Sequence, residues 1–292
     1  MFSDIVNVFL FDGDKIVMPE TLRDLRGLSQ YKADDCKIHE QERDTYKIWE
    51  SPDVEKILLG IENQTETDKD MPLRIIGYDG ASYRSQLLKN KDGNIVESKA
   101  RYPVVSLILY YGEKQWSYSN ELLDCFSSEL KHNEVGNKIS KYISNYQINI
   151  FDVGALKNTE IERFKSDFKL VAEYFANVRI GNVHYTPSAK AIVHVDEFLK
   201  LMSVLTGDSR YEEYIYLYTE EEKMGGLVNM CRVLDARENM GRKEGRKEGR
   251  KEGEQRLLNL IDKLLTDNRM SEIADISTNA ILRNELYMEY DL

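Results

Sequence analysis

A carboxylate and an amide lie two positions apart at the end of an apolar segment. They are Glu62 and Gln64, and they follow the apolar residues 58–61. In a β-strand, alternate side chains point to the same face, so these two would stand side by side at the end of the strand. Carboxylate oxygens are ligands for hard divalent cations such as Mg²⁺, which can activate a bound water for hydrolysis. The spacing therefore predicts a polar site at this strand end.

A second carboxylate is expected opposite Glu62. Residues 43–49 have the composition of a partner strand, and residues 51–53 (Ser-Pro-Asp) supply turn chemistry between the two strands. A hairpin centred near Asp53 sets Asp44 directly opposite Glu62. Like charges that face each other in a sheet are destabilising unless something compensates them, and a divalent cation is one such compensation. Glu42 falls on the same face, opposite Gln64, and is a reserve ligand.

Each of these acids also has a structural interpretation. Asp44 could be a surface acid paired with its neighbour Arg43, and Glu62 could be an edge charge beside Arg74. Supporting groups could come from other helices. Asp79, Tyr83 and Gln86 recur at helical spacing within a helix expected over residues 71–88, so they share one face, which looks either into the site or into solvent. Asp4 and Asn7 of the first helix are further candidates.

The hydrophobic periodicity predicts an α/β fold, of the α+β type with a mixed sheet. A helix is expected over residues 2–10, then a long connection over 18–42 with a helical turn or two in 20–28. Residues 102–111 form an apolar segment typical of a strand buried on both faces, and 148–153 form another short strand. The clearest helix covers 158–177, and amphipathic segments follow at about 190–206 and 211–238. Strands early and helices late favour a sheet flanked and extended by helices.

Four regions are predicted along the chain. The core covers residues 1–180, a helical extension packed on or near it covers 181–240, a charged linker covers 241–256, and a small helical tail covers 257–292. The linker repeats Gly-Arg-Lys-Glu and contains seven basic and four acidic residues. It is either a spacer or a basic arm in which Arg242, Lys243, Arg246 and Lys247 contact phosphate. The tail has dense apolar faces typical of docking or self-association, so a homo-oligomer through these helices is one expectation; a helix-turn-helix is the alternative.

Composition excludes several classes of protein. The chain has 292 residues and a formal net charge of −11, which argues against broad, charge-driven binding of nucleic acid and requires a locally basic groove if DNA is bound. No apolar segment has the length of a membrane helix, and the N-terminus lacks a signal-peptide pattern, so we expect a cytoplasmic protein without membrane contact. Three cysteines make no disulfide framework, and Gly-x-Ser-x-Gly, Walker and dinucleotide-binding motifs are absent from the sequence.

Several segments taken in order resemble a known family. They are Phe-Ser-Asp-Ile-Val-Asn and Leu-Phe-Asp-Gly at the start, Glu-Arg-Asp before the hairpin, Gly-Ile-Glu-Asn-Gln, Tyr-Asp-Gly-Ala-Ser-Tyr, Tyr-Pro-Val-Val-Ser-Leu-Ile-Leu-Tyr-Tyr-Gly, Phe-Lys-Ser-Asp-Phe and the Gly-Arg-Lys-Glu repeat. Together they are similar to the recombination-promoting nucleases, or YhgA-like transposases, of the PD-(D/E)xK nuclease superfamily. The resemblance covers nearly the whole chain, although no single motif decides it.

The resemblance implies a restriction-endonuclease-like core and cleavage of DNA phosphodiesters with Mg²⁺ or Mn²⁺. Asp44 would be the first metal-binding acid and Glu62 the second. Gln64 would take the place of the catalytic Lys of the superfamily. A glutamine can orient a water but carries no positive charge, so the alternative is a catalytically inactive nuclease fold that binds nucleic acid or protein.

Overall fold

The computed structural model describes residues 1–25, 28–32, 38–87, 101–182 and 185–292. The chain divides into two compact units, Met1–Cys231 and Arg232–Leu292. We treat them separately as the first and second unit. The finer division predicted from the sequence, at residues 180, 240 and 256, stays a prediction.

A five-stranded mixed sheet forms the centre of the first unit. Its strands follow the order β1-β4-β5-β6-β7 and are β1 (Leu22–Asp24), β4 (Thr45–Ser51), β5 (Glu55–Gln64), β6 (Val104–Tyr110) and β7 (Asn149–Asp152). β1, β4 and β5 pair antiparallel, whereas β5, β6 and β7 pair parallel. β5 is therefore the strand where the sheet changes direction. The predicted α+β architecture with a mixed sheet is confirmed.

The β4–β5 hairpin has the register predicted from the turn at Asp53. Its pairs run from Ser51 opposite Glu55 to Thr45 opposite Ile61. The next position along would set Asp44 opposite Glu62, although Asp44 itself lies in a bend just before β4. The hairpin thus brings the two acids to one end of a shared ladder.

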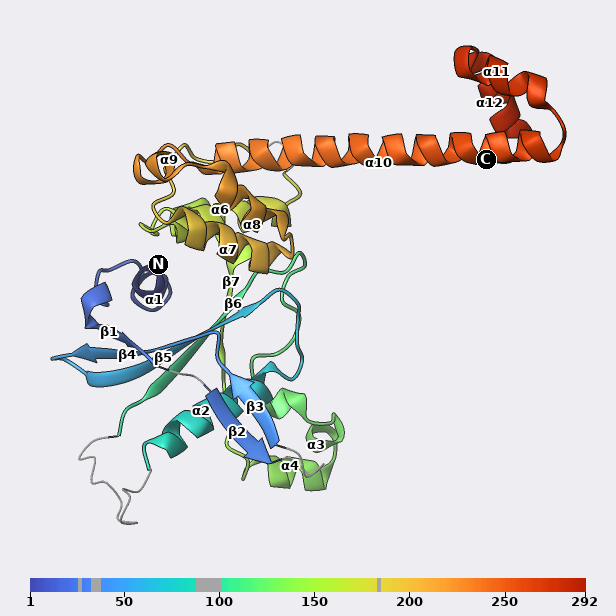
Figure 1. Cartoon of the computed structure of the whole chain (residues 1–292). Helices are drawn as coiled ribbons and strands as arrows, with labels where there is room; N and C mark the ends of the chain where they lie inside the picture. Colours follow the sequence, from blue (N-terminus) through green and yellow to red (C-terminus); the bar gives the residue numbers. More distant parts are fainter. Residues whose placement is uncertain (26–27, 33–37, 88–100, 183–184) are drawn as a thin grey trace. The chain divides into compact units, whose positions relative to one another are not determined.

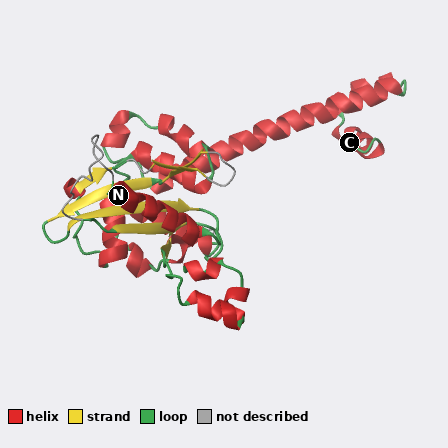
Figure 2. Ribbon diagram, turned by 90° about the horizontal axis from the view of Figure 1, so that it is seen from below, coloured by secondary structure: helices red, strands yellow, loops and turns green. Residues whose placement is uncertain are grey.

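Helices cover both faces of this sheet (Figures 1 and 2). On one face α1 (Phe2–Phe11) packs in a cluster built on Val6, Val17, Trp49 and Leu59. The other face holds α2 (Met71–Ser85), which connects β5 to the parallel strand β6. α2 packs through Met71, Ile75 and Tyr78 on Ile108 and Ile148. Because side chains alternate along a strand, the even-numbered residues of β5 point to this second face.

The remaining elements of the first unit are short. They are the 3₁₀ turns η1 (Pro19–Thr21), η2 (Leu122–Cys125), η3 (Val153–Ala155) and η4 (Ile215–Leu217), and the helices α3 (Glu129–His132), α4 (Glu134–Ser140), α5 (Asn158–Ile161), α6 (Phe168–Arg179), α7 (Val195–Thr206), α8 (Arg210–Tyr214) and α9 (Glu220–Met224). A separate two-stranded sheet pairs β2 (Leu28–Lys32) with β3 (Ile38–Glu42).

Three expectations for secondary structure were wrong. The connection predicted over residues 18–42 holds the strands β1, β2 and β3, and of the helical turns predicted in 20–28 the described residues keep only η1; residues 26–27 and 33–37 lie outside the described part. The single helix predicted over 158–177 is broken into α5 and α6. At the break, the Asp4 carboxylate accepts hydrogen bonds from the backbone N–H groups of Lys165 and Ser166. The segment 211–238 is divided among α8, η4, α9 and the start of the next helix.

The second unit is a small helical assembly. α10 runs from Met230 to Thr266 and includes the whole Gly-Arg-Lys-Glu repeat as helix, followed by α11 (Met270–Thr278) and α12 (Ala280–Glu289). Its core is Leu260, Leu264, Ile276, Leu286 and Tyr287. Among the described helices, α10 included, none has an apolar stretch long enough to span a bilayer.

A substitution at the buried centre of β6 tests the assignment of the core directly. Leu107 is fully buried, so Leu107→Ala removes apolar contacts that the surroundings cannot refill, and we expect the free energy of unfolding to fall by about 3 kcal/mol. Leu73→Ala on the exposed side of α2 is the control, because that side chain is 43% exposed. Urea denaturation measures both. Equal effects of the two variants would contradict the assigned core.

Candidate functional site

Glu62 is a carboxylate buried within the sheet. It lies in β5 opposite Ile108 of β6 and is only 1% exposed, and its Oε1 has no hydrogen-bond partner. Burial and, after it, the nearby charge of Asp44 raise the pKa of Glu62, while Arg43, Arg74 and the backbone N–H of Asp44 lower it; the net pKa is about 7. A buried acceptor without a donor is costly to the fold, and a bound ion, a water or a proton would compensate it.

Asp44 lies at the surface beside this buried acid. Its Oδ2 accepts hydrogen bonds from the backbone N of Asn63 at 2.7 Å and from Asn63 Nδ2 at 3.3 Å. The Tyr111 hydroxyl donates to Asn63 Oδ1 at 3.2 Å. Burial, followed by the charge of Asp44, raises the pKa of Tyr111 well above its usual range, so this hydroxyl stays a donor. The chain from Tyr111 through Asn63 orients the Asp44 carboxylate.

Gln64 is the last residue of β5. It is half-buried and lies opposite Tyr110, and its backbone carbonyl accepts from the backbone N of Tyr111 at 2.8 Å. The alternation of the strand sets its side chain on the same side as that of Glu62. The structure therefore gathers Asp44, Glu62 and Gln64 at the end of the β4–β5 ladder.

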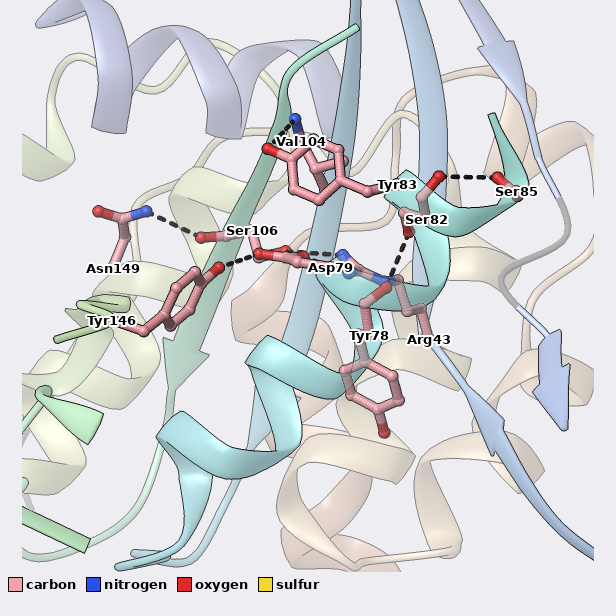
Figure 3. Close-up of polar contacts among 10 residues, drawn as sticks. All are labelled: Arg43, Tyr78, Asp79, Ser82, Tyr83, Ser85, Val104, Ser106, Tyr146 and Asn149. Carbon is pink, nitrogen blue, oxygen red and sulfur yellow. Dashed lines mark hydrogen bonds and ion pairs between the residues drawn. The ribbon is translucent and has the colours of Figure 1, made fainter. Parts of the chain in front are cut away.

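A buried polar network lies next to these residues (Figure 3). The Arg43 guanidinium forms an ion pair with Asp79 of α2 and donates to Ser106 Oγ of β6 at 2.7 Å. The Ser106 hydroxyl donates in turn to Asp79 Oδ1 at 2.6 Å, and the Tyr146 hydroxyl donates to Asp79 Oδ2. Arg43 is 4% exposed and Asp79 is 3% exposed. The partner of Arg43 is thus Asp79, and the proposed surface pair with Asp44 does not form.

The other candidate residues have different surroundings. Tyr83 is 46% exposed, and its hydroxyl accepts a hydrogen bond from the backbone N of Val104. Gln86 makes two hydrogen bonds to the backbone of Tyr102: Nε2 donates to the carbonyl oxygen and Oε1 accepts from the N–H. Both therefore support the segment that leads into β6. Asp4 holds the break between α5 and α6, and Asn7 bonds Ile16 and Val17, so both side chains are engaged away from the acids.

Two groups of predicted residues lie elsewhere. The side chain of Glu42 lies outside the described part of the structure. The basic candidates of the charged repeat, Arg242, Lys243, Arg246 and Lys247, are in α10 of the second unit, where Arg242 pairs with Glu238. Arg74, which the sequence set beside Glu62, pairs with Asp68 at 3.1 Å. Glu62 is therefore a buried acid and not an edge charge.

The sequence pointed to neither Arg43, Asn63 nor Tyr111 as a functional residue. Asn63 and Tyr111 are recognisable only once strand pairing brings β5 beside the end of β6. A signal for Arg43 existed in Gly60, since a Cβ at that position would overlap the Arg43 guanidinium. A glycine inside a strand often marks such a close approach.

The donor set fits a hard divalent cation. Mg²⁺ is typically held by one or two carboxylates, with water and substrate phosphate completing its shell. Glu62 offers an unsatisfied oxygen, and the hydrogen bonds to Asp44 all go to Oδ2. Within the described residues, no group of three or more His, Cys, Asp or Glu side chains is arranged to hold a metal. The protein ligands considered for a cation at this site are therefore the pair Asp44 and Glu62, with water completing the shell.

Comparison with protein families adds an independent observation. Residues 52–194 match the model of the family described as "Putative transposase, YhgA-like". The chain belongs to the YhgA-like family over this range. Glu62, Gln64 and Asp79 lie inside the matched YhgA-like region, whereas Arg43 and Asp44 come just before it. Neither the comparison with curated proteins nor that with solved structures gave a match.

The raised pKa of Glu62 makes stability depend on pH. The folded protein binds the Glu62 proton more tightly than the unfolded chain does, with a pKa of about 7 against 4.5. Ionisation of Glu62 therefore destabilises the folded protein. This loss of unfolding free energy is absent below pH 4.5, grows as the pH rises between the two pKa values, and reaches its full size above pH 7. In metal-free buffer we expect Glu62→Gln to gain about 3 kcal/mol of unfolding free energy over the wild type between pH 4.5 and pH 8.

Urea denaturation across this pH range measures that difference. Glu55→Gln, at an exposed position in the same hairpin, serves as the control and should track the wild type throughout. A difference between Glu62→Gln and wild type that stays constant with pH would show that Glu62 is not the buried, uncompensated acid described above.

Proposed function

We propose that this protein is a metal-dependent DNA endonuclease of the transposase-related, recombination-promoting type. The observation that carries the proposal is the pair of acids at the end of the β4–β5 ladder, one of them buried with an unsatisfied oxygen. Membership of the YhgA-like family supports DNA as the substrate, because transposases act on DNA phosphodiesters.

Each residue has a distinct role in this proposal. Glu62 and Asp44 would bind the cation, Glu62 from the central strand β5 and Asp44 from the surface, where Asn63 orients it. A bound Mg²⁺ or Mn²⁺ would lower the pKa of a coordinated water and offset charge on the phosphoryl group. Gln64 orients the attacking water through its amide. It cannot supply the positive charge of a lysine, so the chemistry depends on the acids.

The second candidate function is a catalytically inactive protein that binds nucleic acid or another protein. The uncharged Gln64 at the lysine position favours it, as does the net charge of −11. In this alternative the exposed basic side chains of α10 contact DNA, or the second unit joins two copies of the chain. Cleavage by the wild-type protein decides between the two functions.

The acid pair generates the first functional prediction. Asp44→Asn and Glu62→Gln remove the negative charge that holds the cation, so each should lower the rate of plasmid cleavage in Mg²⁺ or Mn²⁺ by about 100-fold or more. Glu55→Gln keeps the wild-type rate, because its side chain is exposed at the far end of the hairpin. Wild-type cleavage that survives in both acid variants would contradict the proposal.

Gln64 generates a prediction about the water. Gln64→Ala leaves both acids in place, so we expect Mn²⁺ to bind with unchanged affinity in calorimetry while kcat falls by about 100-fold through misplacement of the nucleophile. A full wild-type kcat in Gln64→Ala would remove the amide from the mechanism. Loss of Mn²⁺ affinity in this variant would instead make Gln64 a ligand.

A further inference from the structure

The two acids of the candidate site are held in very different ways. Glu62 belongs to a strand that is paired on both sides, by β4 and by β6. Asp44 lies in a bend before β4, outside the ladder, and is exposed. Its carboxylate is oriented by Asn63, and its backbone N–H donates to the Glu62 carboxylate. These contacts are made at the site itself, and a further contact, made by the preceding residue, holds the chain that carries Asp44.

The residue immediately before Asp44 supplies that anchor. Arg43 turns inward and inserts its side chain beneath β5, where the guanidinium lies 5.0 Å from the Tyr46 ring centre and 5.3 Å from that of Tyr78. It is bonded to Asp79 of α2 and to Ser106 of β6. Contacts to a helix and to a second strand fix the chain at this point far better than a bend alone.

The space for this anchor comes from Gly60. It is two positions before Glu62 on the same face of β5, and any Cβ there would collide with Arg43 Nη1. The guanidinium is therefore packed directly against the strand that carries Glu62. It is also one of the charges that act on the Glu62 carboxylate.

The charge of the anchor is balanced within the network. Asp79 neutralises Arg43 and is itself satisfied by the hydroxyls of Ser106 and Tyr146 (Figure 3). A buried arginine without this partner would repel a cation at the neighbouring acids. With Asp79 in place, the network fixes geometry at little electrostatic cost to a bound cation. Asp79 thus serves the site without being one of its ligands.

We infer that Arg43, paired with Asp79 and accommodated by Gly60, is the positioning residue that sets Asp44 against Glu62 for joint binding of a divalent cation. The inference rests on the proposed function, because it takes the acid pair as the ligands. With Arg43 and Asp79 included, the residues that shape the site extend from the end of β5 to α2 and β6. An ordinary structural ion pair would stabilise the fold and leave cation affinity unchanged.

Two variants displace the anchor without changing the net charge. Gly60→Ala forces the guanidinium away and keeps every charged group. Arg43→Met with Asp79→Leu replaces the buried pair by apolar side chains, a type of exchange that buried pairs often tolerate. Gly80→Ala is the matched control, since a Cβ at Gly80 of α2 meets nothing within 4 Å. Mn²⁺ affinity is measured by titration calorimetry at a temperature where urea denaturation shows each variant to be folded.

We expect Gly60→Ala and the double variant each to weaken Mn²⁺ binding by about tenfold or more, as loss of residues that orient metal ligands does. Gly60→Ala added to the double variant should change the affinity less than about twofold, because the group it displaces is already gone. A metal-free readout is hydrogen exchange at the Asn63 amide, which donates to Asp44. It should accelerate in both variants while the amides of β6 and β7 keep their wild-type rates.

The outcomes separate the two proposals. Wild-type Mn²⁺ affinity and Asn63 exchange in both folded variants would overturn the positioning role and leave the endonuclease proposal standing. If Gly60→Ala does not fold, the double variant decides alone by the same criteria. If the wild-type protein binds no Mn²⁺, and its titration is the same as that of Glu62→Gln, the proposed function and this inference are both overturned.

Discussion

The burial of the Glu62 carboxylate on β5, the strand that pairs with β4 and β6, is the constraint on which the rest of the site depends. A carboxylate in this position costs stability unless a cation, a proton or a set of donors compensates it. One of its oxygens finds no donor, and its pKa is raised to about 7. A fold that keeps an acid at this cost while setting Asp44 beside it has the arrangement expected of a cation site.

The sheet and its neighbours bring the necessary groups together. β5 is the strand at which antiparallel pairing with β4 changes to parallel pairing with β6. The hairpin supplies Asp44, the strand itself supplies Glu62 and Gln64, and the crossover through α2 supplies Asp79 as the partner of Arg43. Residues that lie far apart in the sequence therefore share one small volume.

Local patterns in the sequence were enough for the ladder but not for its surroundings. The hairpin register followed from the turn residues near Asp53, so the proximity of Asp44 and Glu62 was predictable. The pairing of Arg43 with Asp79 was not, because it joins residues 36 positions apart through tertiary packing. The periodicity over 158–177 predicted helix at both ends of this segment, in α5 and α6, yet it could not show the backbone break at which the Asp4 carboxylate accepts hydrogen bonds from two backbone N–H groups. The strands β1 to β3 lacked a hydrophobic alternation that would have identified them.

We propose that Asp44 and Glu62 together hold a divalent cation. The most direct test is anomalous diffraction from crystals of the full chain soaked in Mn²⁺ above pH 7, where Glu62 is ionised. We predict an anomalous peak shared by the two carboxylates, with oxygen-to-metal distances of about 2.1 Å. Crystals that show no peak between Asp44 and Glu62 at saturating Mn²⁺ would contradict the account.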